Sequence, residues 1–203
     1  MVNQVFKGEV LSRTKVKNNI LRIWKLCGDV DIYDWYREAN GFAIELIDNI
    51  PADSNTVAIR KACGVIAALS PVKQWEQNKI CAIDMIKTGD CGHMKVFKGK
   101  ARRILENGNS EKNILEILKG RKISSFFMNI LYPDNAEIVT IDRHALSVAL
   151  GYRINNETYQ GITKNQYDFF VDCYRLASES VSVSPALMQS ATWVKFRKIK
   201  NNY

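Results

Sequence analysis

Two short segments of the chain carry residue types that could do chemistry together. The first is a glycine among basic residues, Lys119-Gly120-Arg121-Lys122, and the second begins at a lone carboxylate, Asp142, twenty residues after Lys122. A glycine between two helices can adopt positive φ, so the next helix can direct its free amides and its positive dipole end at an anion. The turn is therefore expected to bind one DNA phosphate without reading sequence. The alternative is an ordinary helix–helix connection with solvated charges.

Asp142 has two possible roles, which can coexist. As a helix N-cap it would accept a hydrogen bond from the amide of Ala145. In a partly dry cleft it would stabilise positive charge that develops on a deoxyribose ring, or activate water, when the glycosidic bond breaks. Arg143 and His144 follow directly. We expect both to lie at the DNA, with His144 bracing the turn by hydrogen bonding rather than serving as a general base.

Lys122 also has two possible roles. The favoured role is a charged phosphate contact, because most lysines in such a turn stay protonated. As a neutral amine, Lys122 would instead attack the sugar, form a Schiff base and lead to strand cleavage.

The segment from Ser70 to Asn78 is the third candidate region. It would place Lys73 and Gln74 at the mouth of a cleft, where Gln74 would fill the space left by a flipped base. In the structural alternative, Ser70 caps a helix, Pro71 occupies its first turn and Trp75 packs into the core.

Composition narrows the class of protein. The chain has 203 residues, of which 46% are hydrophobic, enough for a substantial core and a single domain. The formal charge of +8 favours a polyanionic partner, and we expect double-stranded DNA. The five cysteines are scattered and the two histidines are far from them in sequence, so we expect no disulfide framework, metal or cofactor. No apolar run approaches the roughly 18 to 20 residues of a membrane span, and no secretory leader is evident, so we expect a cytoplasmic protein without membrane contact.

Apolar residues recur at helical spacing along most of the chain, which predicts an all-α fold. Three helix starts are marked by capping residues: Ser70-Pro71, Ser184-Pro185, and the capping box Thr163-x-x-Gln166. We expect one domain with two helical lobes, about 55–151 and 1–54 plus 152–203, around a central cleft. The predicted helices are 14–27, 31–48, 55–68, 71–87, 95–106, 110–118, 121–132, 143–150, 163–180 and 185–198.

Two further groups of residues belong to predicted helices. A basic run consisting of Lys95, Lys98, Lys100, Arg102 and Arg103 is either a surface for the DNA backbone or a solvated helix face. Trp193 and Phe196 recur at helical spacing and predict a C-terminal helix that docks by its aromatic side.

Several motifs resemble those of helix-hairpin-helix DNA glycosylases. The segment 118–126 resembles their hairpin, and Ile141-Asp142-Arg143-His144 resembles their Val-Asp-Thr-His segment. Upstream, the segment 68–75, which contains Leu69-Ser70, resembles the Leu-Ser segment of endonuclease III-type enzymes. The differences are a single hairpin glycine, Arg143 in place of threonine, and no four-cysteine iron–sulfur set. The segments 64–71 and 188–197 resemble a group of bacteriophage proteins that share this fold without an assigned reaction.

The resemblance implies a fold, a reaction and site residues. It implies a two-lobed helical protein that flips a base out of duplex DNA and uses the aspartate at the position of Asp142. In members that cleave the strand, it implies a lysine at the position of Lys122. We expect a phage-encoded glycosylase-like protein, located in the host cytoplasm. The alternatives are an enzyme that modifies or exchanges a phage DNA base on the same scaffold, and an inactive module that binds DNA or a host component.

Overall fold

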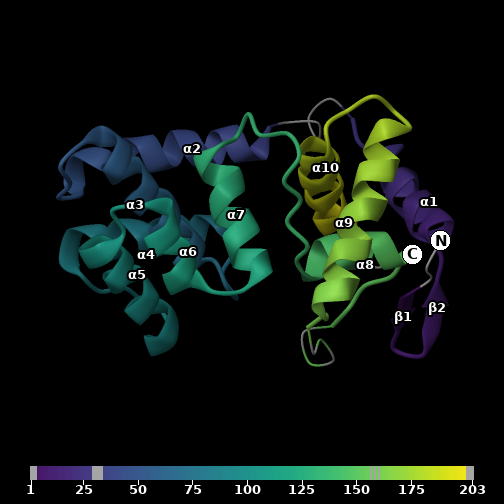
Figure 1. Ribbon diagram of the computed structural model, residues 1–203, viewed down its shortest axis with the longest axis horizontal. Coiled ribbons are helices and arrows are strands. Elements are labelled where there is room, and N and C mark those ends of the chain that lie inside the picture. The colour runs from purple at the N-terminus through teal and green to yellow at the C-terminus, as the bar shows by residue number, and fades with distance from the viewer. Residues whose placement is uncertain (1–3, 29–33, 156, 158, 160, 200–203) are drawn as a thin grey trace. The chain divides into compact units, whose positions relative to one another are not determined.

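The computed structural model describes residues 4–28, 34–155, 157, 159 and 161–199. These residues form ten α-helices, one short 3-10 helix and a two-stranded antiparallel hairpin, so the protein is mainly α-helical, as expected (Figure 1). Within these ranges, no helix is both long enough and apolar enough to cross a bilayer.

The chain forms two compact units, made of residues 1–35 with 135–203 (unit 1) and residues 36–134 (unit 2). These boundaries differ from the expected lobes, because 36–54 pack with unit 2 and 135–151 with unit 1. In unit 2, the Asn40 side chain donates to the carbonyl of Ile130 at 2.8 Å, and the rings of Tyr36 and Phe126 meet edge to face. Tertiary contacts that periodicity does not encode therefore decide the division.

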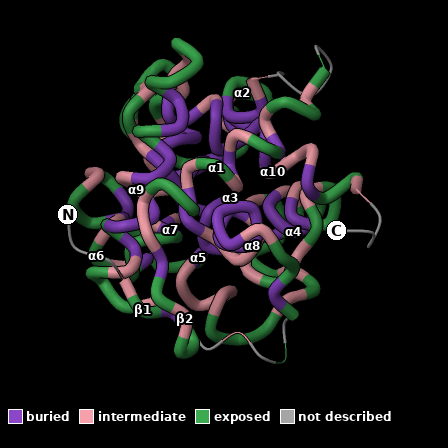
Figure 2. The backbone as a smooth tube through the Cα atoms, turned by 90° about the vertical axis from the view of Figure 1, so that its right-hand side faces the viewer, coloured by how far each residue is buried: buried purple, intermediate pink, exposed green. Residues whose placement is uncertain are grey.

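Unit 2 is built around one buried helix, α3, which contacts the four helices that follow it. Its residues 61–69 are all buried (Figure 2). At Gly64, a Cβ atom would lie only 3.0 Å from the side chain of Ile104 and 3.1 Å from that of Ile114. The glycine thus allows close packing of α3 on the helices that lead to the basic turn. The elements are α2 (Trp35–Glu45, whose first residue belongs to unit 1), η1 (Ile47–Asn49), α3 (Asn55–Leu69), α4 (Trp75–Thr88), α5 (Lys95–Asn107), α6 (Glu111–Leu118) and α7 (Arg121–Leu131).

Unit 1 packs three helices around a short buried one, α8. Residues 145–150 of α8 are all buried, and the hydroxyl of Tyr174 donates to the carbonyl of Ala145 at 2.9 Å. Gly151 ends α8 with φ 82°. The elements are β1 (Gln4–Phe6), β2 (Glu9–Leu11), α1 (Arg13–Trp24), α8 (Arg143–Leu150), α9 (Lys164–Glu179) and α10 (Pro185–Lys198).

Most predicted helix positions are confirmed, including two of the three capping signals. Ser184 caps α10 with Pro185 in its first turn, and Thr163 forms the capping box of α9 with Gln166. The β1–β2 hairpin was not predicted, because the sequence was expected to be all-α. The predicted helix 31–48 begins at residues 31–33, which lie outside the described residues; the described helix starts at Trp35.

The predicted helix start at Ser70-Pro71 was also wrong. Ser70 instead ends α3, and both its amide and its hydroxyl donate to the carbonyl of Ala67. The chain then turns through Val72, which has φ 55°, and α4 begins at Trp75. The serine hydroxyl is therefore used at a helix C-terminus, and residues 71–74 form an exposed or half-exposed loop.

Candidate functional site

The basic turn between α6 and α7 has the backbone geometry expected of an anion-binding turn. Lys119 and Gly120 both have positive φ, 50° and 92°. Gly120 is the N-cap of α7, and no side chain caps this helix. All four residues from Lys119 to Lys122 are exposed. The first turn of α7 therefore faces solvent with its dipole end and basic side chains, an arrangement that suits a phosphate.

Gly120 leaves room for a ligand at this turn. A Cβ atom at Gly120 would meet nothing within 4 Å, so positive φ, and not crowding by the protein, is what calls for glycine. Lys119 adopts positive φ without that freedom, which is an uncommon and costly conformation for a lysine.

The loop 71–74 presents one apolar side chain that the sequence did not single out. Val72 is 80% exposed and has φ 55°, an outlying conformation for a β-branched residue. Gln74 is also exposed and is the N-cap of α4 without a capping bond from its side chain. The signal for Val72 is available only in the structure, as the combination of strain with exposure.

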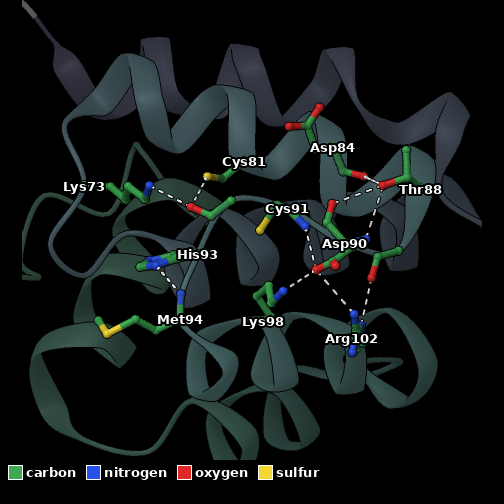
Figure 3. A network of polar contacts seen from close by, with 12 residues as sticks. Lys73, Cys81, Asp84, Thr88, Asp90, Cys91, His93, Met94, Lys98 and Arg102 are labelled. Carbon is green, nitrogen blue, oxygen red and sulfur yellow. Dashed lines mark hydrogen bonds and ion pairs between the residues drawn. The ribbon is translucent and has the colours of Figure 1, made fainter.

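Lys73 ties this loop to the loop that precedes α5. Its Nζ donates to the carbonyl of Gly92 at 2.9 Å, and the side chain is half-buried (Figure 3). His93 follows, with its Nδ1 accepting from the amide of Met94 at 2.9 Å and its ring 4.8 Å from that of Phe97. Burial lowers the pKa of His93, and the charge of Lys73 lowers it further. The structure therefore gives Lys73 a bracing contact within unit 2.

The loop before α5 is fixed by a second set of polar contacts, centred on Asp90. Its carboxylate accepts from the amide of Cys91 at 2.8 Å and pairs with Lys98 at 2.7 Å and Arg102 at 3.4 Å (Figure 3). The hydrogen bonds from Lys98 and from the Cys91 amide hold the pKa of Asp90 below its usual value. These contacts neutralise part of the basic run on α5.

In unit 1, Asp142 is the N-cap of α8, which confirms the structural role expected for it. Its Oδ1 accepts from the amide of Ala145 at 2.7 Å. Its Oδ2 accepts from the indole N–H of Trp193, on α10, at 3.1 Å. The segment before Asp142 is held by Tyr167, whose hydroxyl accepts from the Ile141 amide at 3.1 Å. Donors on both oxygens fix the orientation of this half-buried carboxylate.

Arg143 and His144 contact each other at the start of α8. The guanidinium of Arg143 donates to the carbonyl of Ile154 at 2.8 Å and lies 3.3 Å from Nε2 of His144. Burial lowers the pKa of His144; the Asp142 carboxylate opposes this, and nearby guanidinium groups reinforce it. The guanidinium groups are those of Arg143, Arg153 and Arg197. The neutral imidazole is therefore favoured at neutral pH.

The predicted site residues fall into three groups. Asp142, Arg143 and His144 meet in unit 1. In unit 2, residues 119–122 form the basic turn, and Lys73 and Gln74 belong to the loop 71–74.

A scan against protein families matched residues 3–200 to a family of unknown function, DUF7178. The chain belongs to this family. No curated protein and no solved structure matched it.

In this DUF7178 chain, sequence reasoning missed one residue at the carboxylate. Trp193 was expected to dock α10, but its indole N–H also binds Asp142. The indole is itself held on several sides, with Trp35 and His144 packed edge to face at 5.5 and 6.3 Å and Arg197 4.8 Å from the ring centre. Trp193 lies fifty-one residues from Asp142, so only the packing of α10 on α8 brings them together.

Proposed function

We propose that this chain is a DNA-binding protein with a helix-hairpin-helix glycosylase-like fold that acts on a base extruded from the duplex. The observation that carries the proposal is the exposed turn at Gly120, whose backbone opens an uncapped helix among basic side chains. Three features of the chain support the same function: the resemblance of its motifs to those of helix-hairpin-helix glycosylases, the position of Asp142 at the start of α8, and the net charge of +8.

The hairpin of unit 2 is proposed to bind the DNA backbone. Arg121 and Lys122 supply charge, and the first-turn amides of α7 supply donors for phosphate oxygens. Because Lys122 is exposed in this first turn, phosphate contact remains its preferred role. As a nucleophile it would instead form a C–N bond to the sugar as the bond to the base breaks, and borohydride would trap the resulting Schiff base.

The loop 71–74 is proposed to enter the base stack. Extruding a nucleotide leaves a gap that costs a few kcal/mol in lost stacking, and apolar side chains inserted between bases reduce that cost. Val72 suits this task better than Gln74 alone, because it is apolar, 80% exposed and held in an outlying conformation. Lys73 keeps the loop in place through Gly92.

Asp142 is proposed to stabilise positive charge on the sugar while the glycosidic bond breaks. Both of its oxygens accept hydrogen bonds, which fix the orientation of the carboxylate before charge develops on the sugar. The proposal requires unit 1 and unit 2 to bind the same duplex.

A panel of duplexes with damaged or hypermodified bases tests the proposal, with mass analysis of the released bases. We expect release of at least one base by the unmodified protein. Asp142→Asn should abolish release while duplex binding is retained. Lys122→Ala should abolish borohydride trapping only if the lysine is the nucleophile. Binding without release of any base would remove the enzymatic part.

The second candidate function is a DNA-binding module without chemistry. It is favoured by the structural contacts of Asp142, because the N-cap bond and the Trp193 bond engage both of its oxygens. In that case Asp142→Asn would leave duplex affinity and biological activity unchanged once its effect on stability has been taken into account.

A further inference from the structure

The basic residues of α5 fall into two groups with different surroundings. Lys98 and Arg102 lie one helical turn apart, and both pair with Asp90. The guanidinium of Arg102 also donates to the carbonyl of Gly89 at 2.8 Å (Figure 3). This side of the helix is therefore neutralised within the protein.

Lys100 and Arg103, three residues apart, belong to the side of α5 that meets the hairpin. The Nζ of Lys100 donates to the carbonyl of Leu118, the last residue of α6. Burial lowers the pKa of Lys100, and the charges of Arg103 and Lys119 lower it further. Lys100 thus joins α5 to the hairpin, with two other cations close to it.

These neighbouring cations have no acidic partners. Across the described residues, Arg103, Lys119 and Lys122 form no ion pair, whereas Lys79, Lys98 and Arg102 each do. Arg103 and Lys119 are both exposed. Cations gathered without counter-charges repel one another, and a bound anion would relieve this repulsion.

We propose that Arg103 and Lys119 form a second phosphate-binding site next to the first turn of α7. The site would bind a phosphodiester of the same strand that the hairpin contacts. Lys100 is already bonded to Leu118, so it supports the site rather than contacting the phosphate. The inference rests on the proposed DNA binding and extends it from one backbone contact to two.

The chemistry of the side chains favours a phosphodiester strand. A guanidinium can bind two phosphate oxygens at once, and an adjacent ammonium adds point charge. The anion-binding turn at Gly120 directly follows Lys119 in the chain, so a strand that carries several phosphates suits the two neighbouring sites better than a single small anion does.

The test compares Arg103→Gln with Arg102→Gln, a neighbouring variant on the same helix whose arginine is already paired with Asp90. Affinity for a short fluorescein-labelled duplex is measured over a series of salt concentrations. We expect Arg103→Gln to reduce the slope of log K against log salt by about 0.9. Between about 0.05 and 0.2 M salt, the unmodified protein should then lose about 3.5-fold more affinity than this variant. Arg102→Gln should keep the unmodified slope.

A second variant, Lys119→Gly, should reproduce the smaller slope, because glycine removes the charge and adopts φ 50°, ψ 137° without strain. Thermal unfolding of each variant confirms that it is folded. Equal slopes for the Arg103 and Arg102 variants would overturn this inference and leave the proposed function standing. Failure of the unmodified protein to bind duplex would overturn both. If free pyrophosphate displaced the labelled duplex as effectively as unlabelled duplex does, the second phosphate-binding site would also be overturned, since a small anion would then be the ligand.

Discussion

The contact between Asp142 and Trp193 makes the obvious test of chemistry a change in stability as well. In Asp142→Asn, the single remaining oxygen can accept from either the Ala145 amide or the Trp193 indole. Asparagine is about as good an N-cap as aspartate, so we expect the cap to persist and the indole to lose its acceptor. A hydrogen bond to a charged group contributes about 1.5–3 kcal/mol. Because Asp142 is only half-buried, we expect a loss of about 1–2 kcal/mol, or about 2–8 °C in Tm.

A double-mutant cycle with Trp193→Phe isolates this contact. Phenylalanine keeps an aromatic ring at position 193 of α10 but lacks the indole N–H. In the Trp193→Phe background, Asp142→Asn should therefore no longer lose the indole hydrogen bond. We expect the two single effects to exceed the double effect by about 1 kcal/mol in urea unfolding. Coincident transitions by circular dichroism and fluorescence check that unfolding is two-state. Additivity within about 0.3–0.5 kcal/mol would show that the indole and the carboxylate do not interact.

Three further perturbations follow from the backbone and from His144. Val72→Asn should raise Tm by about 2–4 °C, because asparagine tolerates φ 55° better than valine does. The substitution removes little buried apolar area, since Val72 is 80% exposed. An unchanged Tm would argue against backbone strain at this position. Gly151→Ala should cost about 1–2 kcal/mol for its left-handed backbone (φ 82°, ψ 9°), and more because its Cβ would lie 3.0 Å from the Asn19 side chain; a smaller loss in urea unfolding would contradict this. Because the pKa of His144 is lowered in the folded protein, its contribution to stability is present above about pH 6.5 and is lost as the pH falls through the folded pKa. His144→Gln should therefore flatten the acid side of the plot of stability against pH. An equally steep plot would contradict this.

The sequence predicted the helices well because their determinants are local. α8 was predicted at 143–150 and lies there, bounded by Asp142 and Gly151, whose types suit an N-cap and a left-handed C-terminus. The prediction failed at Ser70-Pro71, where a capping pattern occurs at the end of α3 rather than the start of α4. The same serine–proline pair at 184–185 does start a helix, so the motif alone does not decide.

The candidate site was predictable only within each segment. The bond from Asp142 to the amide three residues later follows from capping chemistry and is present. The bonds from Trp193 to Asp142 and from Lys100 to Leu118 depend on how separate helices pack, which no periodicity encodes. The same limit applies to the charges, because the basic run on α5 looks uniform in sequence until Asp90 is found next to part of it.

The structural and chemical roles of Asp142 need not compete. A carboxylate that stabilises charge in a transition state is most effective when its orientation is fixed beforehand, because no reorganisation is then required as the charge develops. The Ala145 amide and the Trp193 indole supply that fixation, and the packed rings around Trp193 hold the indole in turn. If a base is released, Asp142→Glu, which keeps the charge but displaces it, should therefore impair release through misplacement.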